Sequence, residues 1–286
     1  MRNCDRNFDE NDTVAIILLA GVGRRMGHDL PKSMIPLQSD TSQQRTTFID
    51  RHIALLIESG VDHLVLVVNK FNAFHYERLA SADVSIVVND SDVENTGSSL
   101  SLNFALHAIN RRAPDNFPNV IVMDGDIIYE RRLAKLIADH QASSTLFVTP
   151  NISDDDEEVR VYLREGRPIL IGKGITTRMA DGLTLAGESL GIIKLISKDL
   201  PTLLSLTTWL AGSPTESRAF GYSKQRSEHE EIWQYLFNLH LLAVDGVPAD
   251  IVFSECDNSE DVAFIQEFVL PKILCNDEIY SLSARR

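Results

Sequence analysis

The sequence has few cysteines, little positive charge and no long hydrophobic stretch, and each shortage excludes a class of protein. Its three cysteines, Cys4, Cys256 and Cys275, form no C-x-x-C pair in 286 residues, so a disulfide framework is excluded and a reduced, cytoplasmic setting is expected. The 27 basic and 41 acidic residues give a formal net charge of −14. We therefore expect no nucleic-acid partner and no anionic membrane partner, because both need a positive surface.

The longest apolar run, at 14–22, is about half the roughly 18 residues that a membrane span requires. The first thirteen residues, MRNCDRNFDENDT, mix charges of both signs and lack the hydrophobic centre of a signal peptide. We therefore expect neither a membrane span nor a secretion signal. Hydrophobic residues still make up 44% of the chain, which is enough for a buried core.

Apolar runs alternate with helical patterns through the first half of the chain. Continuous apolar runs, typical of strands covered on both faces, lie at 13–19, 63–69, 84–89, 119–124 and 144–150. Helical spacing of apolar residues lies between them, at 46–58, 71–80, 98–111 and 131–141. This alternation predicts an α/β fold with a Rossmann-like, doubly wound, mostly parallel sheet.

The pattern changes after Pro150. A hairpin is predicted at 159–172, turned by Glu165 and Gly166, and a strand pair or a strand and turn at 183–196. Helices near 198–211 and 228–242, a strand at 249–253 and a last helix at 259–273 follow. We expect one domain at 13–275, with a core at about 13–150 and a smaller lobe at about 151–275.

The most informative segment is LLAGVGRRMGHDLPKSM, residues 18–34. Its glycines follow a buried strand directly, so backbone N–H groups can approach an anion at the carboxyl end of that strand. The charged residues of the segment are Arg24, Arg25, Asp29 and Lys32. They give a local charge of 3 − 1 = +2 in an acidic protein, which predicts a triphosphate-binding loop. The spacing matches neither the dinucleotide fingerprint nor the P-loop.

Two carboxylates, Asp124 and Asp126, follow the strand at 119–124 with one glycine between them. Acids at i and i+2 that leave the carboxyl edge of a sheet suit a hard divalent cation, which prefers oxygen ligands. An ordinary Asp-Gly-Asp turn is the alternative. Together with the anion-binding loop, the pair favours a metal site.

Gly-x-Gly-x-Arg after the first strand, followed by Pro31-Lys32, resembles the nucleotidyltransferase superfamily, which transfers NMP groups to sugar phosphates and related acceptors. The resemblance implies that Arg25 and Lys32 are catalytic, Arg25 at the outer phosphates and Lys32 at the α-phosphate. It also implies Mg²⁺ as cofactor, with Asp126 as one ligand. The segment 251–267 resembles the late strand–turn–helix motif of the family, which implies Asp257 as the second ligand. The loop residues implied to bind nucleotide are Leu19, Ala20, Gly21 and Gly23.

The segment 87–106 is similar to the branch that uses CTP with phosphocholine or phosphonates. The further residues predicted to bind nucleotide are Asn95, Thr96, Ser98, Ser99 and Asp124. Helix capping is the alternative for the two serines. The segment 185–196 resembles a G-E-x-x-G-x-x-K motif from phosphonate chemistry, so that the residues predicted to bind the acceptor are Glu188, Lys194 and Trp233. The alternatives are exposed strand charges for the first two residues and a core aromatic for the third.

The sequence therefore predicts Mg²⁺-dependent transfer of a cytidylyl group from CTP to a small phosphonate or phosphomonoester, with release of pyrophosphate, in phosphonate biosynthesis. We expect a monomer or homodimer and no catalytic histidine, since the eight histidines form no cluster with metal-ligand spacing. One alternative is a sugar-1-phosphate nucleotidyltransferase that uses UTP, GTP or dTTP. Another is an inactive homologue that only binds nucleotide. A Rossmann dehydrogenase is excluded by the motif spacing.

Overall fold

The computed structural model describes residues 7–21, 30–37, 46–91, 97–114, 116–152, 158–212 and 228–283. Four residues with predicted roles lie outside these ranges: Gly23, Arg25, Asn95 and Thr96. Their assignments stay predictions.

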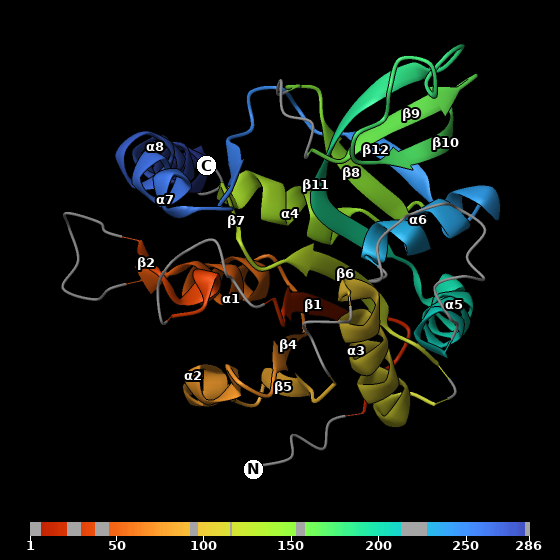
Figure 1. The fold of residues 1–286 in the computed structure, drawn as a ribbon. Helices are drawn as coiled ribbons and strands as arrows, with labels where there is room; N and C mark the ends of the chain where they lie inside the picture. The colour runs from red at the N-terminus through yellow and green to blue at the C-terminus, as the bar shows by residue number, and fades with distance from the viewer. Residues whose placement is uncertain are drawn as a thin grey trace.

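A nine-stranded sheet forms the centre of the fold (Figure 1). Its parallel part consists of β6 (Asn119–Asp124), β1 (Thr13–Leu19), β4 (His63–Asn69) and β5 (Val84–Asn89), side by side in this order. These four strands begin and end at the predicted residues. Their apolar runs are continuous because helices cover both faces of the sheet, and β4 is buried at every position. The predicted α/β class is confirmed.

The other half of the sheet is built around β11 (Thr184–Leu195), which runs antiparallel to β6. The strands that complete this half are β8 (Thr145–Thr149), β9 (Arg160–Arg164), β10 (Arg167–Gly172) and β12 (Ala243–Gly246). The predicted hairpin is confirmed: Glu165 and Gly166 connect β9 to β10 with positive φ angles of 51° and 78°. The region predicted as a strand pair or a strand and turn is one twelve-residue strand, whose pairing shifts register near Gly187 and between Ser189 and Ile193.

Helices pack on both faces of the sheet. The helices on one face are α3 (Ser98–Arg112), α5 (Leu200–Gly212) and α6 (His229–Asn238). The other face is covered by α1 (Phe48–Glu58), α4 (Arg131–Asp139) and the short α2 (Ala73–Tyr76), which continues into the 3₁₀ turn η3 (Glu77–Leu79). The helix predicted at 71–80 is therefore two short pieces, and the one predicted at 228–242 ends at Asn238.

Several short elements surround the carboxyl ends of the parallel strands. They are the 3₁₀ turn η2 (Lys32–Met34), the small pair β2 (Pro36–Leu37) and β3 (Thr46–Thr47), β7 (Ile127–Tyr129) and β13 (Phe253–Glu255). The strand expected at 249–253 is wrong: β13 lies at 253–255, where it pairs antiparallel with β7 outside the main sheet. A further 3₁₀ turn, η4 (Ser197–Asp199), precedes α5.

The chain ends in a longer helical segment than expected. It comprises α7 (Ser259–Phe264), a π-helical turn (Ile265–Val269) and α8 (Leu270–Ser283). Asp277 holds α8 against the core, since its carboxylate pairs with Arg51 at 2.6 Å and accepts a hydrogen bond from the backbone N–H of Arg131 at 2.6 Å. Across the described ranges, no helix has the length and apolarity to cross a membrane.

Candidate functional site

Lys32 opens the turn η2 and extends its side chain toward the carboxyl ends of the strands. The turn is fixed by two backbone hydrogen bonds, from Met34 N to Pro31 O at 2.9 Å and from Ile35 N to Lys32 O at 3.0 Å. The next side chain, Ser33, is buried and shares a 2.7 Å hydrogen bond with the Tyr76 hydroxyl of α2. The backbone at Lys32 is therefore held on both sides, and its ammonium group is directed by the fold.

Asp126 and Asp257 are 131 residues apart in sequence but lie on adjoining segments of the chain. The pairing of β7 with β13 sets Glu255 opposite Ile127, and the N–H of Cys256 donates to the Asp126 carbonyl at 2.9 Å. Beyond Asp257, Asn258 and Asp261 form a capping box that starts α7. Asp261 accepts hydrogen bonds from the N–H groups of Asp257 at 2.7 Å and Asn258 at 2.8 Å, so it positions the backbone of the second aspartate.

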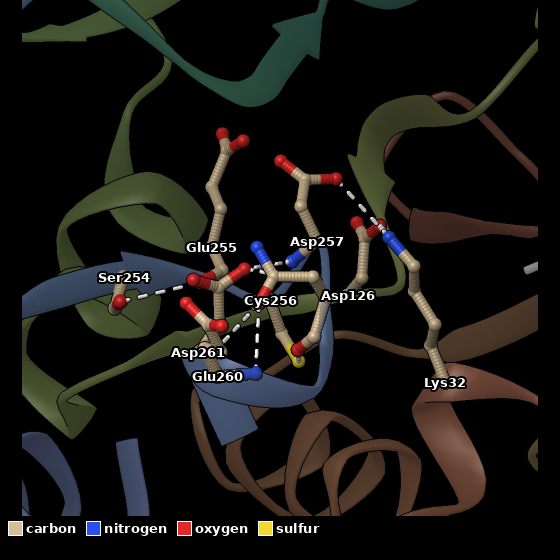
Figure 2. A network of polar contacts seen from close by, with 9 residues as sticks. Lys32, Asp126, Ser254, Glu255, Cys256, Asp257, Glu260 and Asp261 are labelled. Atoms are coloured by element: carbon tan, nitrogen blue, oxygen red, sulfur yellow. Dashed lines mark hydrogen bonds and ion pairs between the residues drawn. The ribbon is translucent and has the colours of Figure 1, made fainter. Parts of the chain in front are cut away.

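The three side chains meet at a single point (Figure 2). Lys32 Nζ lies 3.1 Å from Asp126 Oδ2 and 3.1 Å from Asp257 Oδ1, so one ammonium group joins both carboxylates. Burial lowers the pKa of Lys32, but the two aspartates more than offset that effect and leave the pKa raised. Lys32 is thus a cation at neutral pH. The structure brings together the three described residues that were predicted to form the catalytic and metal centre.

Several carboxyl groups crowd the region around this point. Glu255 extends from β13 on the same side as Asp257. Burial and the neighbouring carboxylates, Asp126 foremost, raise its pKa to about 9. Partial burial and the nearby Asp126 and Glu230 raise the pKa of Asp124 to about 7, although His229 opposes the shift. The raised pKa values show that these acids repel one another, and a bound cation would relieve that repulsion, which fits a site for a further cation.

The donor set suits magnesium in particular. Among the residues that the structure describes, no three His, Cys, Asp or Glu side chains are arranged to hold a metal ion by themselves. Mg²⁺ is usually bound by one or two carboxylates together with water and substrate phosphates, rather than by a cage of protein ligands. Asp126 and Asp257 meet that requirement, because both lie within contact of one cation.

The start of the predicted phosphate loop is anchored by two asparagines, one at the end of β4 and one shortly after it. Asn69 donates to the carbonyl of Ala20 at 2.9 Å, and Asn72 donates to the carbonyl of Leu19 at 3.0 Å. Leu19 is buried against Gly125, where any side chain would collide with it. Leu19 and Ala20 are thus buried residues that shape the loop, while Gly21 is exposed at its open end.

Ser98, predicted to bind nucleotide, lies where α3 and α6 begin side by side. Its hydroxyl donates to Glu228 Oε2 at 2.8 Å and accepts from the N–H of His229 at 2.9 Å. Ser99, the next residue, is buried. His229 also approaches Asp124, with 3.7 Å between Nε2 and Oδ2. Burial lowers the pKa of His229, but Glu230, Asp124 and Glu228 more than offset it, so the pKa is raised.

The residues predicted to bind the acceptor do not gather at this point. Lys194 is 1% exposed, and its Nζ donates to the carbonyl of Ala138 at 2.5 Å, in the last turn of α4. The structure therefore corrects the prediction for Lys194, whose charge is committed to a helix end. Trp233 is 1% exposed within the core between α6 and the sheet, with its ring beside that of His229. Glu188, also buried, lies on β11 opposite Thr149.

The sequence analysis did not identify four residues as part of the site: Asn69, Asn72, Glu255 and His229. Glu255 was interpreted as a turn residue, although its spacing of two from Asp257 on an extended chain places both side chains on one side. His229 left no signal, because nothing in the sequence relates the start of α6 to the end of β6.

Comparisons with known proteins agree with this geometry. The family of MobA-like NTP transferase domains matches residues 15–190. Among curated protein sequences, none matches the chain significantly. The fold is similar to that of a CTP:phosphocholine cytidylyltransferase from Streptococcus pneumoniae, with a TM-score of 0.65, 16% identity, and coverage of 90% of this chain and 98% of that one.

A second similar structure is that of a candidate glucose-1-phosphate thymidylyltransferase from Bacillus anthracis, determined in complex with a sucrose. Its TM-score is 0.62 at 12% identity, over 93% of this chain and 95% of that one. At such identities the two structures show the shared fold, whereas the family match covers more than half of the chain. The chain belongs to the MobA-like NTP transferase domain family and is a nucleotidyltransferase.

Proposed function

We propose that the chain transfers a cytidylyl group from CTP to a small phosphonate or phosphomonoester and releases pyrophosphate. The observation that supports this most directly is the contact of Lys32 with both Asp126 and Asp257 at the carboxyl edge of the sheet. A cation and two carboxylates, brought together from distant segments at the edge of the sheet, are what a metal–triphosphate complex requires.

In the proposed reaction, an acceptor oxygen attacks the α-phosphorus, the bond between that phosphorus and the bridging oxygen breaks, and the electron pair leaves with pyrophosphate. A phosphonate or phosphate monoester is largely ionised near neutral pH, so no general base is needed. The main obstacle is bringing two polyanions together. A bound Mg²⁺, held by Asp126 and Asp257, would neutralise phosphate charge and fix the triphosphate in position.

Lys32 supplies a positive charge from the protein, in addition to that of the metal ion. Its raised pKa keeps it charged, and its fixed backbone directs that charge at the reacting region. Preorganised charge of this kind stabilises a transition state strongly, because no reorganisation is needed as negative charge develops. Arg25 is proposed to hold the outer phosphates and Asp124 to contact the nucleoside. The Ser98 hydroxyl is already shared between Glu228 and His229, and Ser99 is buried, so the alternative role at the start of the helix is favoured for the two serines.

The choice of CTP and of this acceptor class is supported by the segment 87–106, which resembles the branch that uses CTP with phosphocholine or phosphonates. The test is a matrix of CTP, UTP, GTP and dTTP against phosphocholine, 2-aminoethylphosphonate, glucose 1-phosphate and buffer, read as pyrophosphate release. We expect release with CTP and one of the first two acceptors. Release with another nucleotide and the sugar phosphate would favour the sugar-1-phosphate alternative. No release in any well would favour an inactive homologue.

A further inference from the structure

His229 connects three parts of the site that are distant in sequence. It is the first residue of α6, is 9% exposed, and lies between Ser98 at the start of α3 and Asp124 at the end of β6. Its Nδ1 is 2.9 Å from the Ser98 hydroxyl, and its Nε2 is 3.7 Å from Asp124 Oδ2. Asp124 is separated from Asp126 by a single glycine.

The hydrogen bonds around Ser98 fix the roles of the two ring nitrogens. The Ser98 hydroxyl has one proton, which goes to the Glu228 carboxylate, because a carboxylate only accepts. The same hydroxyl oxygen must then accept from its other neighbours, so the Nδ1 of His229 is the donor in its contact with Ser98. This leaves Nε2 as the ring atom that faces Asp124, and in the protonated ring Nε2 carries a second N–H that attracts the carboxylate.

Capping of the two helices does not require the ring. Ser98 N donates to Glu228 at 3.2 Å and His229 N donates to the Ser98 hydroxyl at 2.9 Å, so the two helix starts satisfy each other through these groups. Asp124 is also confined from another side: Gly191 of β11 has a φ of 63°, and a Cβ there would lie 2.5 Å from Asp124 Oδ2. The carboxylate is thus enclosed between an imidazole and a glycine that leaves room for it.

We propose that His229 is a positioning residue that fixes the Asp124 carboxylate through Nε2 and thereby the Asp124–Gly125–Asp126 turn that presents the metal aspartate. This role rests on the proposed function, in which Asp126 holds the cation of a metal–CTP complex. Residues that orient metal ligands from behind typically affect metal affinity by about 10-fold to 100-fold when they are replaced. We expect about a 10-fold loss in affinity for Mn²⁺ with CTP when Nε2 is removed.

The test uses two replacements that each keep one nitrogen of the ring. An asparagine amide nitrogen reaches the Nδ1 position, and a glutamine amide nitrogen reaches the Nε2 position. Binding of Mn²⁺ to the full chain is measured by electron paramagnetic resonance with saturating CTP and no acceptor, and unfolding midpoints are measured in parallel. We expect His229→Gln to bind within about threefold of wild type and His229→Asn to lose about 10-fold. A role limited to the Nδ1 contact with Ser98 predicts the reverse order; that order, or equal binding in the two variants, would overturn the proposal.

A double-mutant cycle with Asp124→Asn provides a second measurement. If His229 acts through Asp124, His229→Asn should weaken Mn²⁺ binding no further once Asp124 is replaced. Losses that multiply would overturn the positioning role. Asp126→Asn tests the proposed function separately from the role of His229: unchanged Mn²⁺–CTP binding in that variant would overturn the proposed function itself. A loss in Asp126→Asn beside normal binding in His229→Asn would overturn the role of His229 alone.

Discussion

Lys32 lies where a divalent cation would meet Asp126 and Asp257, so the lysine and the metal should compete for the two carboxylates. The perturbation that tests this is Lys32→Met, which keeps an unbranched side chain of similar length and removes the charge. Without nucleotide, the variant should bind Mn²⁺ more tightly than wild type, because no internal cation has to be displaced.

The size of the expected change in Mn²⁺ affinity follows from how far the three side chains are exposed to water. The Lys32 side chain is 18% exposed, whereas those of Asp126 and Asp257 are 34% and 52% exposed, so water screens both pairs. Ion pairs of this kind contribute up to about 1 kcal/mol each. With about 1.4 kcal/mol for each factor of ten, the loss of both pairs should tighten Mn²⁺ binding by up to about 30-fold.

The assay is titration of Mn²⁺ by electron paramagnetic resonance at constant ionic strength, with and without CTP. Lys198→Met is the matched control, since Lys198 is an exposed lysine in η4, whose first residue, Ser197, contacts Asn119 at the opposite end of β6. With CTP present the order should reverse, because Lys32 is then proposed to contact phosphate oxygens. Mn²⁺ binding without nucleotide that is no tighter in Lys32→Met than in Lys198→Met would refute the reasoning.

Three further predictions concern residues outside this contact. Gly191→Ala should lower Mn²⁺–CTP affinity by about tenfold, because the added Cβ displaces Asp124. It should also lower the free energy of unfolding by about 1–2 kcal/mol, because Gly191 has a left-handed backbone. Unaltered affinity in a binding titration would contradict the role of Asp124 in positioning the metal aspartate. Burial lowers the pKa of Lys194 to about 8, so between about pH 8 and 10.5 the unfolded chain binds one more proton than the folded chain. The free energy of unfolding of the wild type should therefore rise over this range, by at most about 3 kcal/mol, relative to that of Lys194→Met. Urea-unfolding profiles that stay parallel for the two proteins would contradict this. Asp277→Ala should lower the free energy of unfolding by about 3 kcal/mol, since it leaves the Arg51 guanidinium without its ion-pair partner, yet should leave the nucleotide affinity of the folded protein unchanged in calorimetry.

The sequence predicted β1, β4 and β6 well because each is buried along most of its length and therefore has a continuous apolar run. It predicted less where one hydrophobic pattern fits several structures. The segment 183–196 contains glycines that look like turns, but in a long strand they are sites of irregular pairing. The helix beginning near 259 was expected to end at 273, yet it continues to Ser283 because Asp277 anchors it to Arg51, a contact that no local pattern encodes.

The candidate site likewise contains residues that the sequence could predict and residues that it could not. The segments that carry Lys32, Asp126 and Asp257 could be identified because each has a local motif, and the structure brings these three side chains together. The position of Lys194, in contrast, could not be predicted from a local pattern. A charged residue in a strand favours an exposed position, but this strand lies between β6 and β8, and a helix end accepts the ammonium group. His229 became visible only when α3, α6 and β6 were seen side by side.

The most direct test of the central claim is binding of Mn²⁺ with CTP to Asp126→Asn, Asp257→Asn and the double variant. If both aspartates hold one cation, each single change should weaken binding by about 10-fold or more, and the double change should weaken it by much less than the product of the two. Wild-type affinity in either single variant, or losses that multiply in full, would contradict the shared metal centre.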